Sequence, residues 1–394
     1  MRRPFIVIVA VAAVAAGLAV GMFAAGIAPA AGPSPSPSQV AVVPSPSSTL
    51  ASPSPAPTAT PAPTATPSPT PVPTPALVPA PLTGVLVTPS AATRHPIAVM
   101  IDDLSPARPQ SGFSAASVVW QAPAEGGIPR YMMVFQENIP TDVGPVRSSR
   151  YYYIAWAAEW RAVYAHAGGS PQALQTLREK GNGQLVYNAD EFRWGNSFWR
   201  TDRDPPHNLY TDGKNLRSIA KTVKASDKPL KPVWKFAADA KAHDRPRGGR
   251  IETGYRANHI RYDYDWATNT YLRTVTGEGK QFDAATGDRV APKNVVVMWM
   301  HFGPLGNGPN HGRLEADVVG SGKAWISTNG KTIIGTWKKA SLTKPTQFFD
   351  TKGKQVTLTV GQTFVQVMPA GTAVTIVAGK APPVIPVPPG QTPA

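Results

Sequence analysis

The chain contains no cysteine in its 394 residues. This absence excludes disulfide bonds, thiolate zinc sites and a cysteine nucleophile. Two histidines, His301 and His311, stand beside Gly303-Pro304 and Gly312, a context typical of loops rather than of a metal pair. We therefore expect no metal site, and no motif identifies a cofactor.

The chain also has few acidic residues. It contains 24 Asp and Glu and 39 Lys and Arg, which give a net charge of +15. Beyond Arg2 and Arg3 the chain carries 37 basic and 24 acidic residues, a net charge of +13. Such an excess favours an anionic partner. No nucleic-acid recognition motif accompanies the charge, which argues against nucleic acid as that partner.

Charged residues are absent from Phe5 to about Ala31, an apolar run that follows Arg2 and Arg3. We interpret residues 1–31 as a targeting segment and not as part of the fold. The run is long enough to span a bilayer, which favours an uncleaved membrane anchor. Ala28-Pro29-Ala30 also fits a cleavage site, so a signal peptide and a secreted mature protein are the alternative. In both cases the rest of the chain is extracytoplasmic.

Residues 32–82 contain 17 prolines and no charge. Such a composition cannot bury enough apolar surface to fold, so we expect a disordered, semi-rigid linker. Residues 380–394 form a second Pro-rich segment, which we expect to be a disordered tail.

Residues 83–230 alternate between strand and helix patterns and predict an α/β domain with a mixed, partly parallel sheet. Residues 231–379 contain short apolar strands separated by turn dipeptides such as Asn329-Gly330. This spacing predicts a mainly β domain, either a sandwich or barrel-like.

Residues 141–171 contain several basic side chains. We predict that this segment forms a loop, a helix, a strand and a second helix, in that order. The sequence predicts a helix from Arg147, with Arg147 and Arg150 on one face of its first turn, beside free backbone N–H groups. The following strand ends at His166, and Ser170 fits the N-cap of the second helix. Because such ends meet at one edge of an α/β sheet, we expect an anion site there. The alternative is that Ser170 only caps its helix and both arginines are surface charges.

Other polar candidates follow strand ends or stiff turns. Asp102 ends the predicted strand Ile97–Asp102, and Glu125 lies in the loop before the strand that starts at Arg130. Farther along, residues 187–210 are both polar and aromatic, which predicts an ordered loop over a site. Pro205-Pro206 stiffens the approach to His207 and Asn208. The alternative is a packed surface loop with His207 bonded to backbone.

Ten segments of the chain carry a family resemblance. They are PIAVMIDDLSPARPQSG, APAEGGIPRYMMVFQ, VGPVRSSR, YAHAGGSPQAL and PPHNLY, followed in order by NHI, YLR, NVVVMW, GTWKK and FVQVMP. Together these segments resemble the YerB-like family. The resemblance implies a two-domain protein at the bacterial cell envelope, and it implies no established reaction. Many members have Asn at the position of Asp103, which favours Asp102 as a site residue. Lacking cysteine, this chain departs from the lipoprotein members of the family.

Three functions compete at this stage. The first is the binding of an anionic cell-envelope component on a membrane-tethered stalk. The second is a hydrolase or transferase for an anionic glycan or phosphate ester, and the third is an envelope assembly scaffold. The catalytic candidates are histidines as general acid or base and carboxylates as their partners: His166, His207, Asp102 and Glu125. The ligand-binding candidates are Arg130, Arg147, Arg150, Ser170 and Asn208. The sequence does not define an oligomeric state.

We expect export and anchoring to depend entirely on residues 1–31. Deleting these residues should leave a soluble cytosolic protein, because the charge-free apolar run is then lost. Cell fractionation of the full-length and shortened chains measures the outcome. Membrane association of a chain that begins at Thr83 would contradict the expectation.

Overall fold

A computed structural model describes residues 76–306 and 312–381. The chain divides into two units, Met1–Thr70 and Pro71–Ala394, and the described residues belong to the second. The predicted anchor, most of the linker, His311 and all but the first residues of the tail lie outside the described residues. Within the described part of the chain, no helix is long and apolar enough to cross a membrane.

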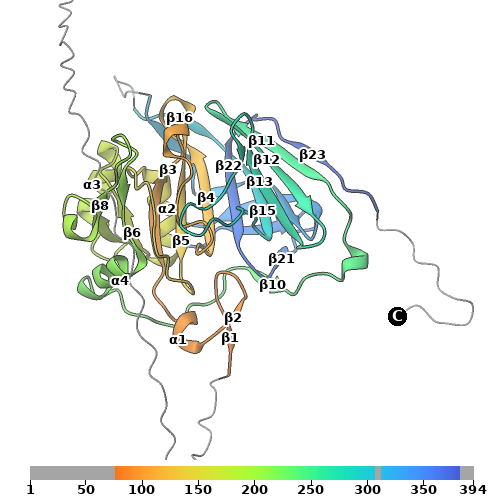
Figure 1. Cartoon of the computed structure of the whole chain (residues 1–394), viewed down its shortest axis with the longest axis horizontal. Coiled ribbons are helices and arrows are strands. Elements are labelled where there is room, and N and C mark those ends of the chain that lie inside the picture. The colour runs from red at the N-terminus through yellow and green to blue at the C-terminus, as the bar shows by residue number, and fades with distance from the viewer. Residues whose placement is uncertain (1–75, 307–311, 382–394) are drawn as a thin grey trace, which may run out of the picture. The chain divides into compact units, whose positions relative to one another are not determined.

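A ten-stranded mixed sheet runs through the molecule in the order β20-β19-β18-β15-β22-β4-β5-β3-β6-β7 (Figure 1). The strand bounds are β3 Ile97–Asp102, β4 Val118–Pro123, β5 Pro129–Phe135, β6 Val163–His166, β7 Tyr187–Asp190, β15 Asn294–Met300, β18 Gly320–Thr328, β19 Lys331–Lys339, β20 Gln347–Asp350 and β22 Thr363–Pro369. The pairs β15·β22, β22·β4, β3·β6 and β6·β7 are parallel.

Both faces of this sheet are covered, which explains why its strands are continuous apolar runs. In β3, Ala98 and Met100 point into one core, while Ile97, Val99 and Ile101 point into the other. The same period of two divides β15 and β22 between the two cores. The sheet therefore forms the middle layer of the fold.

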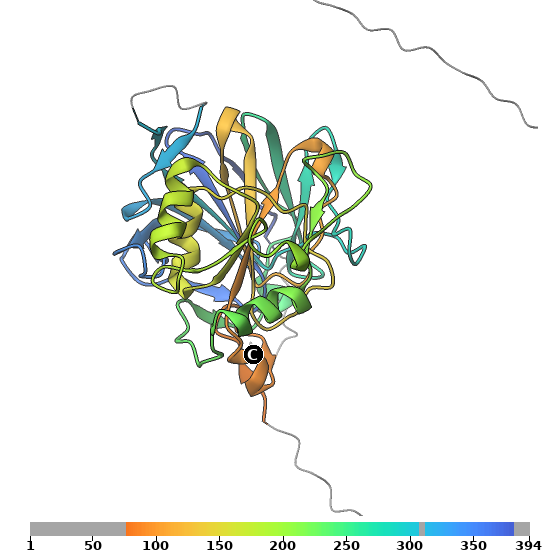
Figure 2. The ribbon, with the colours of Figure 1, turned by 90° about the vertical axis from the view of Figure 1, so that its left-hand side faces the viewer.

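Helices cover parts of both faces (Figure 2). The helices are α1 Pro89–Ala92, α2 Tyr151–Ala157, α3 Pro171–Lys180 and α4 Gly213–Thr222. Buried residues of α2 and α3 belong to one core, and those of α4 belong to the other. Ser170 and Asp212 cap α3 and α4 through their side chains.

A five-stranded antiparallel sheet, in the order β14-β13-β12-β11-β23, packs on the same side of the large sheet as α4. Its strands are β11 Arg250–Tyr255, β12 Asn258–Asp265, β13 Thr270–Val275, β14 Gly279–Lys280 and β23 Thr375–Val377. Along β12 the buried and exposed residues alternate, because one face packs inward and the other faces solvent.

The remaining elements are short. Four two-stranded pairings join β1 Val78–Pro79 to β2 Leu86–Val87, β8 Trp199–Arg200 to β9 Leu209–Tyr210, β10 Lys235–Ala237 to β21 Thr357–Thr359, and β16 Phe302–Pro304 to β17 Leu314–Ala316. The 3-10 turns are Ser105–Ala107, Glu125–Gly127, Ala158–Trp160, Gly195–Ser197 and Ala242–Asp244.

The predicted fold class is confirmed: the N-terminal half contains a mixed, partly parallel sheet and the C-terminal half is mainly β. Each of the two large sheets is open at both ends, so the described residues form no closed barrel. The two halves also share one sheet, because β22 of the C-terminal half pairs with β4 of the N-terminal half.

A buried polar network closes the contact between the halves. The side-chain amide of Gln121 on β4 donates to Asp103, and its oxygen accepts from Arg273 Nη2 on β13 at 2.8 Å. Asn258 on β12 donates to the same Asp103 carboxylate at 3.0 Å. Burial disfavours the Arg273 cation, but Tyr131, Tyr262 and Asp103 outweigh burial and raise its pKa.

We expect Arg273→Met to lower the free energy of unfolding by roughly 2–4 kcal/mol, because the buried side-chain oxygens of Gln121 and Gln281 then lose the donor that Arg273 supplies. The Asp103 carboxylate keeps its ion pair with Arg108 at 2.8 Å. Urea unfolding of the full-length protein, followed by circular dichroism, measures the loss. The control is Arg261→Met on the neighbouring strand, whose side chain is 44% exposed and pairs with Asp263. A similarly small change in both variants would contradict a structural role for the network.

Candidate functional site

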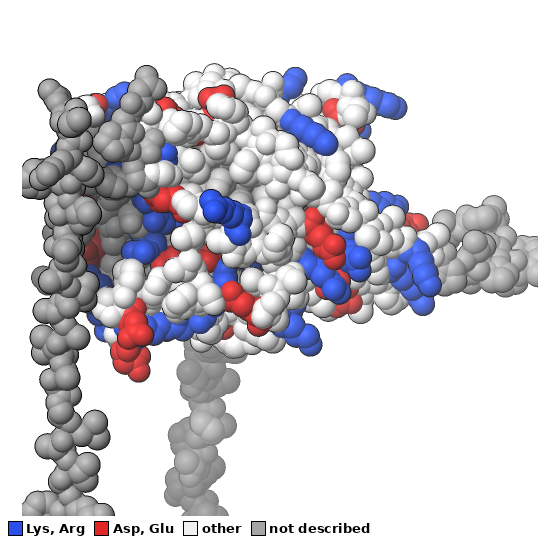
Figure 3. Space-filling model, turned by 90° about the horizontal axis from the view of Figure 1, so that it is seen from above, with Lys and Arg blue, Asp and Glu red and all other residues white. Residues whose placement is uncertain are grey.

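Six strands of the large sheet, β15, β22, β4, β3, β6 and β7, run in the same direction, since β5 is antiparallel to both β4 and β3. Their carboxyl ends consequently meet at one edge, at the top of Figure 1. Asp102, His166 and Asp190 end β3, β6 and β7, and Glu125 follows the end of β4. On the uncovered part of this edge, basic and acidic side chains are interspersed (Figure 3).

The segment before α2 crosses this edge as extended chain. The N–H of Arg147 donates to Met100 O at 2.9 Å, and the N–H of Ser149 donates to Gly168 O at 2.9 Å. These bonds hold the segment between the ends of β3 and β6, so α2 begins only at Tyr151. The expectation of a helix from Arg147 was wrong, because pairing with the sheet replaces the first helical turn.

Asp102 joins two of the predicted site residues. Its Oδ2 atom lies 2.8 Å from His207 Nδ1 and 2.8 Å from Arg147 Nε. Its Oδ1 atom accepts from the N–H of Leu104 at 3.1 Å. The Arg147 side chain is 27% exposed, and no partner of its Nη atoms is recorded among the described residues. The arrangement leaves the end of the guanidinium available to a ligand.

His207 reaches Asp102 from the loop between β8 and β9. Arg203, in the same loop, donates from its two Nη atoms to Ala107 O at 2.9 Å and Pro109 O at 3.0 Å. The imidazole is nearly buried, and its Nδ1 donates to the carboxylate. Nε2 has no recorded partner in the described part of the chain. Asn208 uses its side-chain oxygen to accept from Arg200 at 3.0 Å.

A second group of charges surrounds Glu125. Arg150 Nε and Nη2 donate to its two oxygens at 2.6 and 2.5 Å, and Arg130 Nη2 lies 3.7 Å away. Burial opposes ionisation of Glu125, but the hydrogen bonds and charge of Arg150, with the charge of Arg130, outweigh burial and lower its pKa. Burial, followed by the charge of Arg150, lowers the pKa of Arg130 to about 10. Arg130 is therefore still charged at neutral pH.

Arg150, which the sequence suggested as a ligand-binding residue, already has partners within the protein. It is the residue before α2, it is buried, and both of its Nη groups have partners, Glu125 and Ser149 O. A bidentate, buried pair of this kind fixes the Glu125 loop to the start of α2. Arg130 likewise donates to Ser148 O at 2.8 Å. Of the three arginines, Arg147 has the most freedom to contact a ligand.

His166 and Ser170 lie at the same edge, with other partners. The His166 side chain is fully buried, with Nδ1 2.8 Å from Gly168 O and Nε2 2.8 Å from Asn188 Oδ1. Neither nitrogen is free for proton transfer in this arrangement. Ser170 accepts from the N–H of Ala173 at 3.3 Å, as an N-cap does. These contacts favour structural roles for both residues.

The aromatic stretch begins as strand β7 and then turns outward. Phe192 is 81% exposed, and its ring lies next to Gly168. Trp194 packs against Arg193, whose guanidinium carbon is 5.6 Å from the ring centroid. The predicted loop thus lies beside the β6 end of the site.

Metal-ligating side chains do not gather in the part of the chain that the structure describes. No group of three or more His, Asp and Glu side chains is arranged to hold an ion there. His301 lies 3.3 Å from Asp317, and both side chains are largely exposed.

Comparison with known proteins gives the relationships of the chain. Residues 82–226 match the family described as "Protein of unknown function (DUF3048) N-terminal domain", and residues 251–365 match its C-terminal domain. "Putative lipoprotein YerB" of Bacillus subtilis (strain 168) is 31% identical over 306 residues, which are 76% of this chain and 89% of that protein. The crystal structure of YerB protein from Bacillus subtilis is similar with a TM-score of 0.65 and 27% identity, covering 75% of this chain and 99% of that chain.

The lowered pKa of Glu125 makes its contribution to stability dependent on pH. A carboxyl whose pKa falls on folding stabilises the fold above its unfolded pKa of about 4.3, and this stabilisation is lost as the pH falls through the folded value. We expect Glu125→Gln to reduce the free energy of unfolding by roughly 2–3 kcal/mol at neutral pH and by much less near pH 2.

Urea unfolding at the two pH values measures this difference. The matched control is Glu252→Gln, because Glu252 and its partner Arg250 are 39% and 43% exposed. An exposed pair should contribute less than about 0.5 kcal/mol. An equal loss for Glu125→Gln at both pH values would show that its charge is not the cause.

Proposed function

Because the chain belongs to the YerB-like family, we propose that it is an extracytoplasmic, envelope-associated protein that binds an anionic ligand at the carboxyl edge of its ten-stranded sheet. The name of the relative, a lipoprotein, supports a place at the outer side of a membrane. The sequence has no cysteine to carry a lipid, so we assign the tether to residues 1–31.

The observation that carries the proposal is the position of Asp102 between His207 Nδ1 and Arg147 Nε, at 2.8 Å from each. The carboxylate forms an ion pair with Arg147 at its inner nitrogen, and no partner of the two Nη groups is recorded among the described residues. A planar fork of donors suits a phosphate or carboxylate.

The local charge balance also favours an anion. Three arginines, Arg130, Arg147 and Arg150, lie around two carboxylates, Asp102 and Glu125. With His207 neutral, one positive charge is in excess. A ligand with one or more negative charges compensates it, and the net positive charge of the exported chain favours its approach.

A hydrolase or transferase acting on an anionic glycan or phosphate ester is the second candidate, and the His207–Asp102 pair favours it. Donation from Nδ1 to the carboxylate fixes the imidazole tautomer and leaves Nε2 as the proton acceptor. Nε2 would then remove a proton from water or from an acceptor hydroxyl while Arg147 binds the anionic group.

Glucose 1-phosphate is a suitable probe, with glucose as the neutral comparison. We expect Arg147→Gln to weaken calorimetric binding of glucose 1-phosphate by at least about tenfold, because a charge-assisted contact is removed. Unfolding stability should change by less than about 1 kcal/mol, since the side chain is partly exposed. The control variant is Arg178→Gln on α3.

His207→Gln separates the two candidates in the same experiment. A binding protein loses affinity and releases no phosphate with either variant, whereas an enzyme loses phosphate release far more than affinity. Unchanged binding of glucose 1-phosphate by Arg147→Gln, together with a large loss of stability, would refute the anion site.

A further inference from the structure

The five-stranded sheet covers only part of the large sheet beneath it. Val295 and Val297 on β15 are buried beneath it, as are Phe364 and Met368 on β22. Trp325 on β18 and Ile334 on β19 belong to the same face, since their neighbours Ala324 and Ile326 point into the opposite core. Ile334, which pairs with Trp325 across these strands, is 58% exposed. An apolar floor therefore lies open beside β23.

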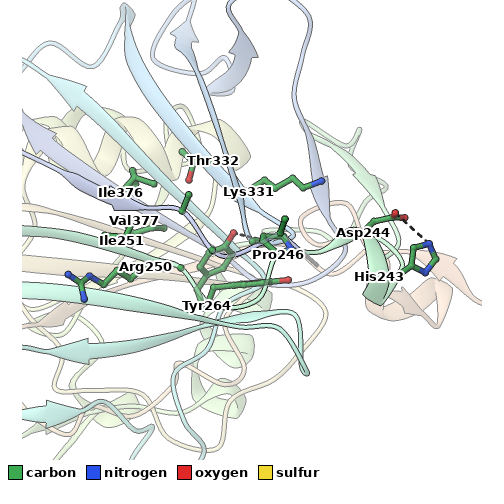
Figure 4. Close-up of a pocket in the computed structure, with 16 residues that line it drawn as sticks. His243, Asp244, Pro246, Arg250, Ile251, Tyr264, Lys331, Thr332, Ile376 and Val377 are labelled. Atoms are coloured by element: carbon green, nitrogen blue, oxygen red, sulfur yellow. Dashed lines mark hydrogen bonds and ion pairs between the residues drawn. The ribbon is translucent and has the colours of Figure 1, made fainter. Parts of the chain in front are cut away.

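Two cavities flank this floor along β23. One, of about 520 Å³, is lined by Trp299, Lys323 and Trp325 and by residues 370–374. The other, of about 590 Å³, is lined by Thr332, Lys331 and Ile376 among others (Figure 4). We call this surface, from Trp299, Lys323 and Trp325 past Ile334 to Thr332 and Lys331, the β23 groove.

The first cavity contains a preorganised pair of indoles. Trp299 and Trp325 meet edge to face with centroids 5.1 Å apart, and Lys323 Nζ lies 4.7 and 4.4 Å from the two centroids. Trp299 Nε1 donates to Thr372 O at 2.8 Å, which fixes its ring. Trp325 Nε1 is buried and has no acceptor among the described residues. Aromatic surface and a cation beside it thus occur together.

We propose that the β23 groove binds a linear anionic polysaccharide. Pyranose rings offer C–H faces to the indoles and hydroxyls to nearby donors, and a uronate or phosphate group pairs with Lys323. Lys323 stands at one end, and at the other end Lys331 lines a cavity that also contains Arg250 and Asp244. The groove is a separate surface from the Arg147 site.

The length of the groove also fits a polymer better than a single sugar. Lys331 pairs with Thr328, five residues along β18 from Lys323. At the rise of a strand, the two ends are ~17 Å apart, the length of several sugar units. A neutral chain would use the indoles but leave Lys323 unpaired, so charge distinguishes the ligand class.

The test titrates the full-length protein with tetragalacturonate and, as the neutral chain, with cellotetraose. We expect Trp325→Ala to weaken tetragalacturonate binding at least about tenfold, as loss of a central aromatic contact does. Lys323→Gln should weaken tetragalacturonate but leave cellotetraose unchanged, and the loss should shrink in high salt. Trp266→Ala, a Trp stacked on Arg247 outside the groove, is the matched control.

Arg147→Gln should leave tetragalacturonate binding by the groove intact. The experiment therefore tests the β23 groove separately from the anion site at Arg147. Lys323→Gln removes an exposed side chain and keeps the fold, so it tests the proposal even if Trp325→Ala unfolds. Equal binding of both tetrasaccharides by all variants would overturn the proposal. Trp325-dependent binding to anionic phosphatidylglycerol vesicles without tetragalacturonate binding would also overturn it, in favour of a membrane contact.

Discussion

The buried contact of Asp103, Gln121 and Arg273 is the constraint on which the arrangement of this molecule depends. Gln121 belongs to β4 in the N-terminal half, and Arg273 belongs to β13 in the C-terminal half. Asp103 is paired with Arg108 of its own half at 2.8 Å, but the buried Gln121 and Arg273 side chains complete their hydrogen bonds only when the two halves are together. The β22·β4 pairing also joins the two halves, because the ten-stranded sheet is complete only when strands of both halves pair.

The network also positions the candidate site. Asp102 and Asp103 are neighbours at the end of β3, and their side chains serve different purposes. Asp103 accepts from Asn258 and Gln121 at the junction between the halves, whereas Asp102 accepts at the open edge from His207 and lies against Arg147. A shift of β3 that weakened the junction would consequently move the proposed anion site as well. Rigidity at the junction is the physical basis for precision at the edge.

Local patterns were enough to predict much of the fold. The apolar run Ile97–Asp102 and the Ser170-Pro171 helix start agree with β3 and α3, because both signals depend on residues close in sequence. The start of α2 was misplaced, since Arg147 is held by a backbone bond to Met100 on another strand. Arg150 was suggested as a ligand-binding residue, and the sequence did not predict its buried pair with Glu125, 25 residues away. No local signal reports such a partner.

In the candidate site as well, the sequence predicts features that depend on neighbouring residues, but not contacts between residues far apart in the chain. Placing Asp102 and His166 at strand ends needed only the sequence, but pairing Asp102 with His207 joins residues 105 positions apart. His166 and His207 are equivalent as residue types, and their partners alone distinguish them. Both His166 nitrogens contact fixed groups. In residues 76–306 and 312–381, no partner is recorded for His207 Nε2 or for the Nη groups of the neighbouring Arg147. Partner geometry, rather than residue type, therefore makes the Asp102–His207–Arg147 cluster the part of the molecule best suited to bind an anion and to move a proton.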